Sequence, residues 1–186
     1  MEEDERAAIS ETLDKSAAIL QTHFDRSNLG LEIHQTYLDL ITVGTATLLF
    51  EEAEPGASSA FRFTAVPVGQ IALEEGVSGR LDTTYRNTEL TPDQLRAKFP
   101  NARLPKHETA RNDDFRHTVV EAVVPDGAGY SYAAVLATGG DEATILSTGT
   151  FERSPFINFR WMKAPGEVYG RSPVMKTLPD IKGATG

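Results

Sequence analysis

Apolar residues recur every three or four positions over residues 4–24. They are Ile9, Leu13, Ala17, Leu20 and Phe24. This spacing is that of one helical face, so it predicts an amphipathic helix packed on a core. After a break at Ser27 or Asn28, either of which can cap the next element, a second helix is predicted over about residues 31–43, ending at Gly44.

From residue 45 onward, short β-prone runs alternate with turns. Strands are predicted over residues 45–50, 61–68, 80–87, 115–124, 130–138, 143–152 and 156–163. Residues 71–73 can continue the second of these beyond a bend at Pro67. Thr91 and Gln94 form a capping box, which predicts a short helix over residues 92–99. The last four strands are joined by short turns, which favours an antiparallel β-meander.

The C-terminal stretch is punctuated by prolines and glycines. A strand should end near Lys163, followed by a turn at Pro165-Gly166, and Gly170 can adopt a positive φ. Ser172 is placed to cap a helix that begins at Pro173. Pro179 lacks an N–H, which predicts a break and a new helix starting there.

This stretch resembles a known family signature. The run from Pro165 to Met175, followed by Leu178 to Lys182, is similar to the signature of the head-to-tail connector, or portal, proteins of short-tailed bacteriophages. Its positions are Pro165, Gly166, Glu167, Tyr169, Gly170, Arg171, Ser172, Pro173, Leu178, Pro179 and Asp180. Two earlier blocks also resemble the portal pattern. One is the Gly-Thr pair after the second helix, and the other is residues 79–86 followed by Thr91 and Gln94-Leu95.

The predicted elements give an α+β fold with two N-terminal helices, a mostly antiparallel β-sheet and short helices near the C-terminus. The resemblance implies that this fold corresponds to the wing of a portal. Residues 1–186 are expected to form one domain. It would divide into a helical part (1–43), a β-rich part (44–163) and a turn that starts a helix directed toward the stem (164–186). Because a long helix follows this signature in the family, we expect the chain to be the amino-terminal portion of a longer portal.

The resemblance also implies a structural role in the virion, after synthesis in the host cytoplasm. About a dozen copies would form a ring at one capsid vertex. The implied partners are the terminase, capsid and scaffold proteins, tail or head-completion proteins, and double-stranded DNA passing through the channel. Neither a catalytic residue nor a cofactor is expected.

Charge and composition fit this expectation. The 186 residues include 27 Asp and Glu against 18 Lys and Arg, a formal net charge of −9, without the basic cluster that tight DNA binding requires. The sequence contains no cysteine, which excludes disulfides and cysteine-ligated metals within it. The acidic first residues do not resemble a secretory signal, and no apolar run reaches the length of a membrane span.

The sequence offers one motif for a competing function. Gly139-Gly140-Asp141-Glu142 matches a tetrapeptide that diguanylate cyclases carry in a nucleotide-contacting hairpin. Here Ala143 follows it, no βαβ pattern surrounds it, and a tight hairpin turn accounts for the same residues. A nucleotide-binding enzyme built on this turn is the alternative function, and a generic β-rich interaction module is a third.

The remaining polar and aromatic residues give weaker signals. The histidines, none at metal-ligand spacing, are His23, His34, His107 and His117. Arg171 can pair with Glu167 in its own subunit or with a carboxylate of a neighbouring subunit, and Tyr169 lies between them. Phe159 and Trp161 are predicted to be strand residues in the core rather than a base-stacking platform, because no basic residues accompany them.

Overall fold

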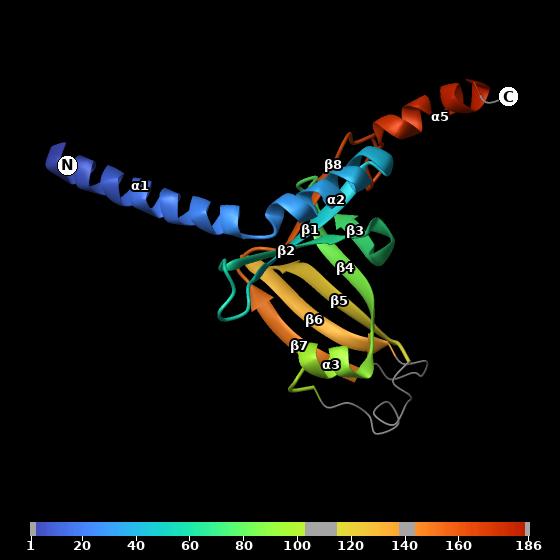
Figure 1. The fold of residues 1–186 in the computed structure, drawn as a ribbon. Coiled ribbons are helices and arrows are strands. Elements are labelled where there is room, and N and C mark those ends of the chain that lie inside the picture. Colours follow the sequence, from blue (N-terminus) through green and yellow to red (C-terminus); the bar gives the residue numbers. More distant parts are fainter. Residues whose placement is uncertain (1–2, 103–114, 138–143, 185–186) are drawn as a thin grey trace.

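The chain forms an α+β fold, as predicted. The structure is a computed structural model that describes residues 3–102, 115–137 and 144–184 (Figure 1). It begins with two helices, α1 (Glu3–Arg26) and α2 (Leu29–Thr42). The elements that follow are β1 (Thr45–Glu52), β2 (Phe61–Val66), the 3-10 turn η1 (Val68–Gln70), β3 (Ile71–Glu75), β4 (Leu81–Leu90), α3 (Pro92–Lys98), β5 (His117–Asp126), β6 (Gly129–Ala137), β7 (Thr144–Phe151), β8 (Phe156–Arg160) and α5 (Pro173–Ala184).

The described strands form two antiparallel sheets. One has the order β2-β1-β8 and the other the order β3-β4-β5-β6-β7. The meander prediction therefore holds for β5 to β7, but β8 leaves it and pairs with β1, with Leu48 opposite Ile157. The Phe50 N–H donates to the Pro155 carbonyl (2.9 Å), so the turn before β8 is already attached to β1.

A similar change of sheet occurs after β2. The strand stops at Val66, because Pro67 and the turn η1 redirect the chain, and β3 then pairs with β4 in the other sheet. The interpretation that residues 71–73 continue β2 is thus wrong. A proline without a donor ends a ladder, and the hairpin with β4 supplies new partners for the residues that follow.

The capping box is confirmed at α3. The Gln94 N–H donates to Thr91 Oγ1 (3.2 Å), and the Thr91 N–H donates to Gln94 Oε1 (3.0 Å). Pro92 occupies the first turn, where its missing N–H leaves no gap in the helix. Residues 103–114, between this helix and β5, lie outside the described residues.

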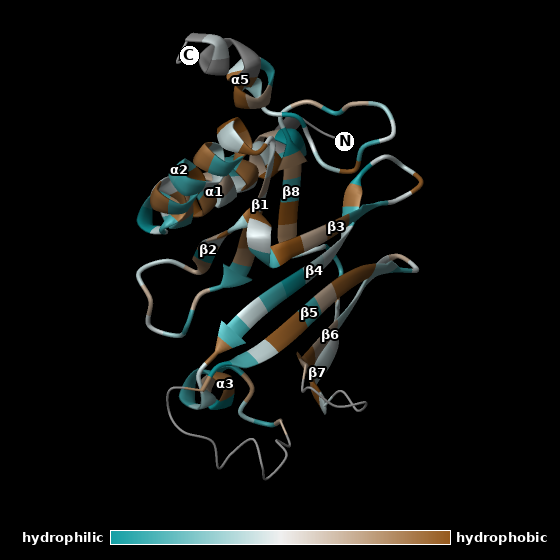
Figure 2. Cartoon of the chain, turned by 90° about the vertical axis from the view of Figure 1, so that its right-hand side faces the viewer, coloured by the Kyte–Doolittle hydropathy of each residue, from teal (hydrophilic) through white to brown (hydrophobic). Residues whose placement is uncertain are grey.

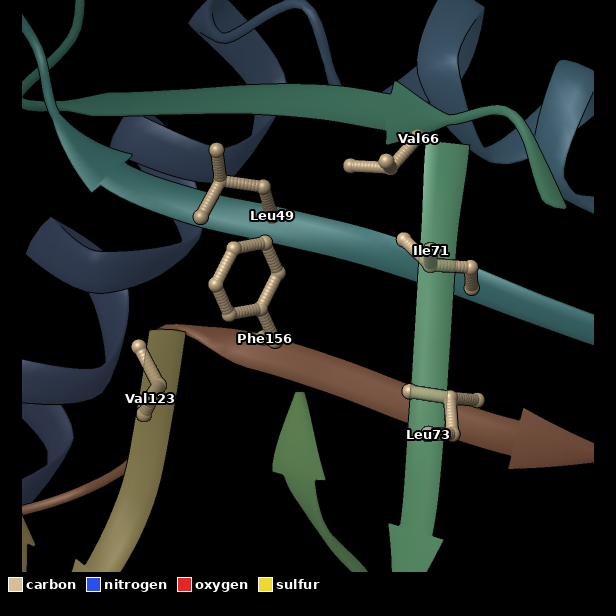
Figure 3. Packing of buried hydrophobic residues seen from close by; sticks show 6 residues of the cluster. All are labelled: Leu49, Val66, Ile71, Leu73, Val123 and Phe156. Atoms are coloured by element: carbon tan, nitrogen blue, oxygen red, sulfur yellow. The ribbon is translucent and has the colours of Figure 1, made fainter. Parts of the chain in front are cut away.

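The described residues contain two buried apolar clusters. The first lies between the two sheets and joins Leu49, Val66 and Phe156 of one to Ile71, Leu73 and Val123 of the other (Figure 3). The second lies under α3 and consists of Leu95, Phe99, Val119, Ala134, Leu136 and Leu146. Figure 2 shows that β5 and β8 are rich in apolar residues.

A polar group separates the two clusters on β5. Glu121 is only 6% exposed, and it accepts hydrogen bonds from Lys98 Nζ (2.7 Å) and the Tyr132 hydroxyl (3.0 Å). Burial, followed by the nearby Glu121 charge, raises the pKa of Tyr132, which keeps its hydroxyl protonated as a donor. A buried carboxylate is tolerated here because it is both paired and hydrogen-bonded.

The packing predicted for the first helix is wrong. The helix α1 forms over nearly the expected residues, but it projects away from the sheets (Figure 1). Its apolar face is exposed, with Leu13 64% and Leu20 50% accessible. The periodicity identified the apolar face correctly, but periodicity alone does not specify what covers such a face.

The last turn of α1 and the start of α2 are attached to β2. Phe24 packs on Phe61 with ring centroids 5.0 Å apart. The Asn28 side chain pairs with both backbone groups of Phe63, accepting from its N–H (2.9 Å) and donating to its carbonyl (2.7 Å). Asn28 is the residue before α2 but makes no side-chain cap bond, because its amide is used on β2 instead.

Candidate functional site: the junction of the signature segment with the α2–β1 corner

The segment that carries the family resemblance crosses the corner between α2 and β1. We call residues 165–173 the signature segment. The Gly170 N–H donates to the buried Thr45 Oγ1 (2.7 Å), and the Arg171 N–H donates to the Met162 carbonyl (2.8 Å). From the other side, the Trp161 N–H donates to the Gly44 carbonyl (2.9 Å). The backbone of the segment is therefore held by the Thr45 hydroxyl at the start of β1 and by the Met162 carbonyl just after β8.

Two glycines make this crossing possible. A Cβ atom added to Gly170 would lie 2.1 Å from the Gly44 carbonyl oxygen, and one added to Gly44 would lie 2.5 Å from the Ser172 nitrogen. Gly44 also has a φ of +89°, as expected where a glycine ends a helix. Gly170 is not among the positive-φ residues of the described chain, so its predicted role was wrong. Glycine is required at position 170 because the neighbouring backbone leaves no room for a side chain, and not because the backbone there is left-handed.

The turn and the helix start were predicted correctly. Gly166 has a φ of +79°, in the turn that opens the signature segment after Pro165. Ser172 is fully buried, and its Oγ accepts from the Met175 N–H (2.9 Å), which caps α5 as Pro173 begins it. The direction in which α5 leaves is thus set by a buried cap beside the glycine crossing.

The helix α5 runs through Pro179 instead of breaking there. Its backbone is helical from Pro173 to Ala184, a single helix that includes the positions of Asp180 and Lys182. A proline inside a helix removes one hydrogen bond, the one to the carbonyl four residues earlier, while residues on both sides keep theirs. Leu178, just before it, is 43% exposed.

An ion-pair group secures the strand that precedes the segment. Arg160, only 12% exposed at its side chain, donates from Nη1 to Glu75 Oε2 (2.6 Å) and to the Val168 carbonyl (2.9 Å), and from Nη2 to the Gly79 carbonyl (2.9 Å). Lys163 Nζ pairs with the other Glu75 oxygen. These bonds, from Arg160 first and then Lys163, hold the pKa of Glu75 below its ordinary value.

This group marks where β8 ends. The prediction that the strand reaches Lys163 was wrong, because β8 stops at Arg160 and the backbone turns toward the Gly44 carbonyl. Trp161 is 54% exposed, so the prediction that it lies in the core was wrong as well, whereas Phe159 is half-buried on the strand.

Tyr169 connects the signature segment to the second sheet. Its hydroxyl accepts from the N–H of Leu73 on β3 (3.1 Å). Near it, Glu167 and Arg171 form a two-bond pair within the subunit, with Nε to Oε2 at 3.0 Å and Nη2 to Oε1 at 2.6 Å. The bonds to Arg171 lower the pKa of Glu167. Of the two pairings left open by the sequence, the structure contains the one inside the subunit.

The other candidate residues do not join this site. His23 and His34 lie on α1 and α2 and His117 begins β5, while His107 and the Gly139–Glu142 turn lie outside the described residues. Within the described part of the chain, no three His, Asp or Glu side chains are grouped so that they could hold a metal ion. None of the helices in that part has the length and hydropathy of a membrane span.

The chemistry of the junction is that of a structural joint. Its polar side chains cap a helix, bind backbone groups or pair with each other. Sequence reasoning missed Arg160, Glu75 and Thr45, whose partners are distant in the chain. Gly44 was recognised only as a helix end. The Gly-Thr pair at residues 44–45 was noted as a resemblance, and this was the available signal for the corner.

Comparison with known proteins agrees with the geometry. The family model described as "Bacteriophage head to tail connecting protein" matches residues 1–185. A "Probable portal protein" of Bordetella phage BPP-1 is 24% identical over 193 residues, covering 96% of this chain and 34% of that protein. The chain thus spans about a third of the length of the curated relative it matches. Because the family match includes both terminal helices, both sheets and the signature segment, this chain belongs to the bacteriophage head-to-tail connecting protein family.

Proposed function

We propose that this chain is part of a structural subunit of a phage portal, the ring through which DNA enters and leaves the capsid. The observation that carries the proposal is the family match over residues 1–185, which includes the signature segment and its glycine crossing. A ring subunit must hold its peripheral body at a fixed angle to the helices nearer the axis. The buried cap at Ser172 and the Gly44–Gly170 contact fix such an angle for α5.

In this proposal residues 1–186 form one wing-like unit, and α5 leads toward the stem. About a dozen copies would close the ring by repeating one head-to-tail contact. The partners would be the terminase, capsid and scaffold proteins, and tail or head-completion proteins, in a virion assembled in the bacterial cytoplasm. The eleven signature positions act as a joint rather than as a catalytic site.

The acidic charge of the chain is consistent with a portal through which DNA passes without being bound tightly. Proteins that bind the phosphate backbone tightly present clustered Lys and Arg, which release counterions. Here acidic residues outnumber basic ones by 27 to 18. A wing of this charge would repel packaged DNA at short range and leave contact to other parts of the ring.

The alternatives receive less support. A nucleotide-binding enzyme would rest on Gly139-Gly140-Asp141-Glu142 alone, and the family match describes a connecting protein instead. A generic interaction module explains neither the match over the whole described chain nor the signature segment. Calorimetric titration with guanine nucleotide and Mg²⁺ checks the first alternative. Saturable binding that Asp141→Ala abolishes would favour the enzyme.

The proposal is tested by negative-stain electron microscopy of the purified gene product that contains this chain. We expect closed rings of one size with a central hole. A phage with a nonsense mutation in this gene should accumulate capsids without DNA, and the wild-type gene supplied in trans should restore packaging. A product that stays uniformly monomeric, or a mutant phage that packages normally, contradicts a portal role.

A further inference from the structure

The long N-terminal helix exposes an apolar stripe that the described chain covers in part at its last residue, Phe24. The helix α1 has 24 residues, so it is about 36 Å long at 1.5 Å per residue. We define its stripe as the five apolar positions with helical spacing, Ile9, Leu13, Ala17, Leu20 and Phe24. Leu13 is 64% exposed, and Ile9 and Leu20 are each 50% exposed.

The stripe is continuous with an aromatic group at the base of the helix. Phe24 contacts Phe61 (5.0 Å) and Phe63 (6.2 Å), and Phe50 stacks on Phe63 with centroids 5.1 Å apart. Phe24 is 39% exposed and Phe50 37%, so this group is only partly covered. The apolar surface therefore extends from the free part of α1 onto β1 and β2.

A helix in this position is stabilised mainly by what packs on it. Helices that lack tertiary contacts are only marginally stable in water, and large exposed apolar patches mark interaction surfaces. The loop before β2 is hydrogen-bonded to α1 near its C-terminal end, at His23. The Ser59 hydroxyl donates to the His23 carbonyl (2.7 Å), and the Ala60 N–H donates to His23 Nδ1 (3.1 Å). The first five turns of α1 therefore extend beyond the body (Figure 1).

The chain carries a second exposed apolar surface on the opposite side. The helices α2 and α5 contact each other, and each exposes apolar side chains. We call them the α2–α5 ridge: Leu38, Ile41, Val174, Met175 and Leu178, each 37–48% exposed. In Figure 1, α1 and α5 extend to opposite sides of the body.

The net charge of α1 is opposite in sign to that of α5. The helix α1 contains six acidic and three basic residues, whereas α5 contains two lysines and one aspartate. The other helix of the ridge, α2, adds Glu32 and Asp39, which are both half-buried. Lys176 lies within the ridge and is exposed. Opposite charge beside matched apolar surfaces favours one partner and one orientation.

We propose that the apolar stripe of α1 docks on the α2–α5 ridge of a second copy of this chain. Because the two surfaces are different and lie on opposite sides, their pairing is heterologous, the kind that repeats around a ring. The inference rests on the proposed portal function and identifies the contact that joins neighbouring subunits. A later segment of the same chain is the less favoured occupant, because α5 leads away from the side on which α1 projects (Figure 1).

Cysteine cross-linking tests this contact. The given sequence has no cysteine, so Leu13→Cys and Leu178→Cys can be made in separate full-length proteins cleared of any other cysteine. After mild oxidation, a mixture of the two should yield a disulfide-linked dimer, and the double variant should yield a ladder up to the full ring. The matched control mixes the Leu13→Cys protein with an Ile145→Cys protein. Ile145 is 64% exposed on β7, outside the ridge, so this pair should not cross-link.

A second test uses assembly itself. Leu20→Lys, in the stripe, should reduce the ring fraction in size-exclusion chromatography at least tenfold, while Ala18→Lys, on another face of α1, should leave it unchanged. Rings that form without the Leu13–Leu178 cross-link, and that tolerate Leu20→Lys, overturn this inference but leave the portal function standing. A wild-type product that forms no rings contradicts the portal function itself. A cysteine at Leu13 that is protected from maleimide in monomers shows that the same chain covers the stripe, which also overturns the inference.

Discussion

The contact between Gly44 and Gly170 places two backbone segments closer together than any side chain allows. One segment ends α2 and the other leads into α5, although 125 residues separate Gly170 from its hydrogen-bond partner Thr45. The joint is thus built from small residues and backbone bonds, which do not change rotamer. A contact of this kind holds an angle more firmly than a contact between long side chains, because packed backbones have little freedom.

Substituting Gly170→Ala tests this contact. The added methyl would lie 2.1 Å from the Gly44 carbonyl oxygen and 2.9 Å from the Arg160 Cβ, so the backbone must move, at a loss of about 1–3 kcal/mol in the free energy of unfolding. Denaturant unfolding measures the loss. The control is Gly30→Ala at an open, exposed position of α2, which should stabilise by up to about 1 kcal/mol. Equal stability of the two variants would show that the crossing is not tight.

The Glu75 group gives a pH prediction. Its folded pKa is lowered by Arg160 and Lys163, so its stabilising effect is present above the ordinary value of 4.5 and is lost as the pH falls through the folded pKa. Glu75→Gln should therefore be less stable than wild type near neutral pH, and the difference should shrink below pH 4.5. Urea titrations at several pH values measure this, with Glu74→Gln at the exposed neighbour as the control. A difference that stays constant with pH excludes the ionised pair as its cause.

At the scale of elements, local signals predicted what forms but not what it packs against. The capping box at Thr91 and the cap at Ser172 were predictable because each bond spans three residues. The separation of β8 from the meander was not, because Ser154-Pro155 indicates a turn without indicating which sheet receives the next strand. For α1, the periodicity is the same whether the apolar face packs on the core of its own chain or is left exposed, so it could not predict which occurs. The ion pair of Arg160 with Glu75 could not be predicted, because the two residues lie 85 positions apart in the chain.

The continuation of α5 through Pro179 leads to a prediction of its own. If the helix is continuous, Pro179→Ala restores a backbone donor in its interior and should stabilise α5 by up to about 3 kcal/mol. Native-state hydrogen exchange of the α5 amides measures the gain. Pro173→Ala is the matched control, because proline at the first helical position is already favourable and its loss should bring no gain. A similar response at both positions would indicate that a second helix starts at Pro179.

At the scale of the whole molecule, the two sheets share one core. Phe156 of one sheet and Val123 of the other belong to the same buried cluster, at 6% and 0% exposure. The α+β class and the existence of most strands were predictable from alternation and turn residues. The division into two sheets was not, because it depends on pairings such as Leu49 with Phe156, which are remote in sequence.

The shared core predicts cooperative unfolding. Phe156→Ala should cost about 3–5 kcal/mol, and both sheets should still unfold in one transition. Far-UV circular dichroism follows the strands, while fluorescence of Trp161 follows the end of β8. The neighbour Ile157, 46% exposed, is the control, and its change to alanine should cost about 1 kcal/mol or less. Two separate transitions in the Phe156 variant would mean that each sheet is held by its own packing.

The position of the glycine crossing also determines how the molecule transmits force. Tension applied between the first turn of α1 and the last turn of α5 passes along α2 to the α2–β1 corner, through the pairing of β1 with β8, and out along the signature segment. The five-stranded sheet lies to one side of this path and is joined to it by the bonds of Arg160 to Glu75 and of Tyr169 to Leu73. We therefore expect the stretched molecule to yield first at the corner, while β4 to β7 stay intact.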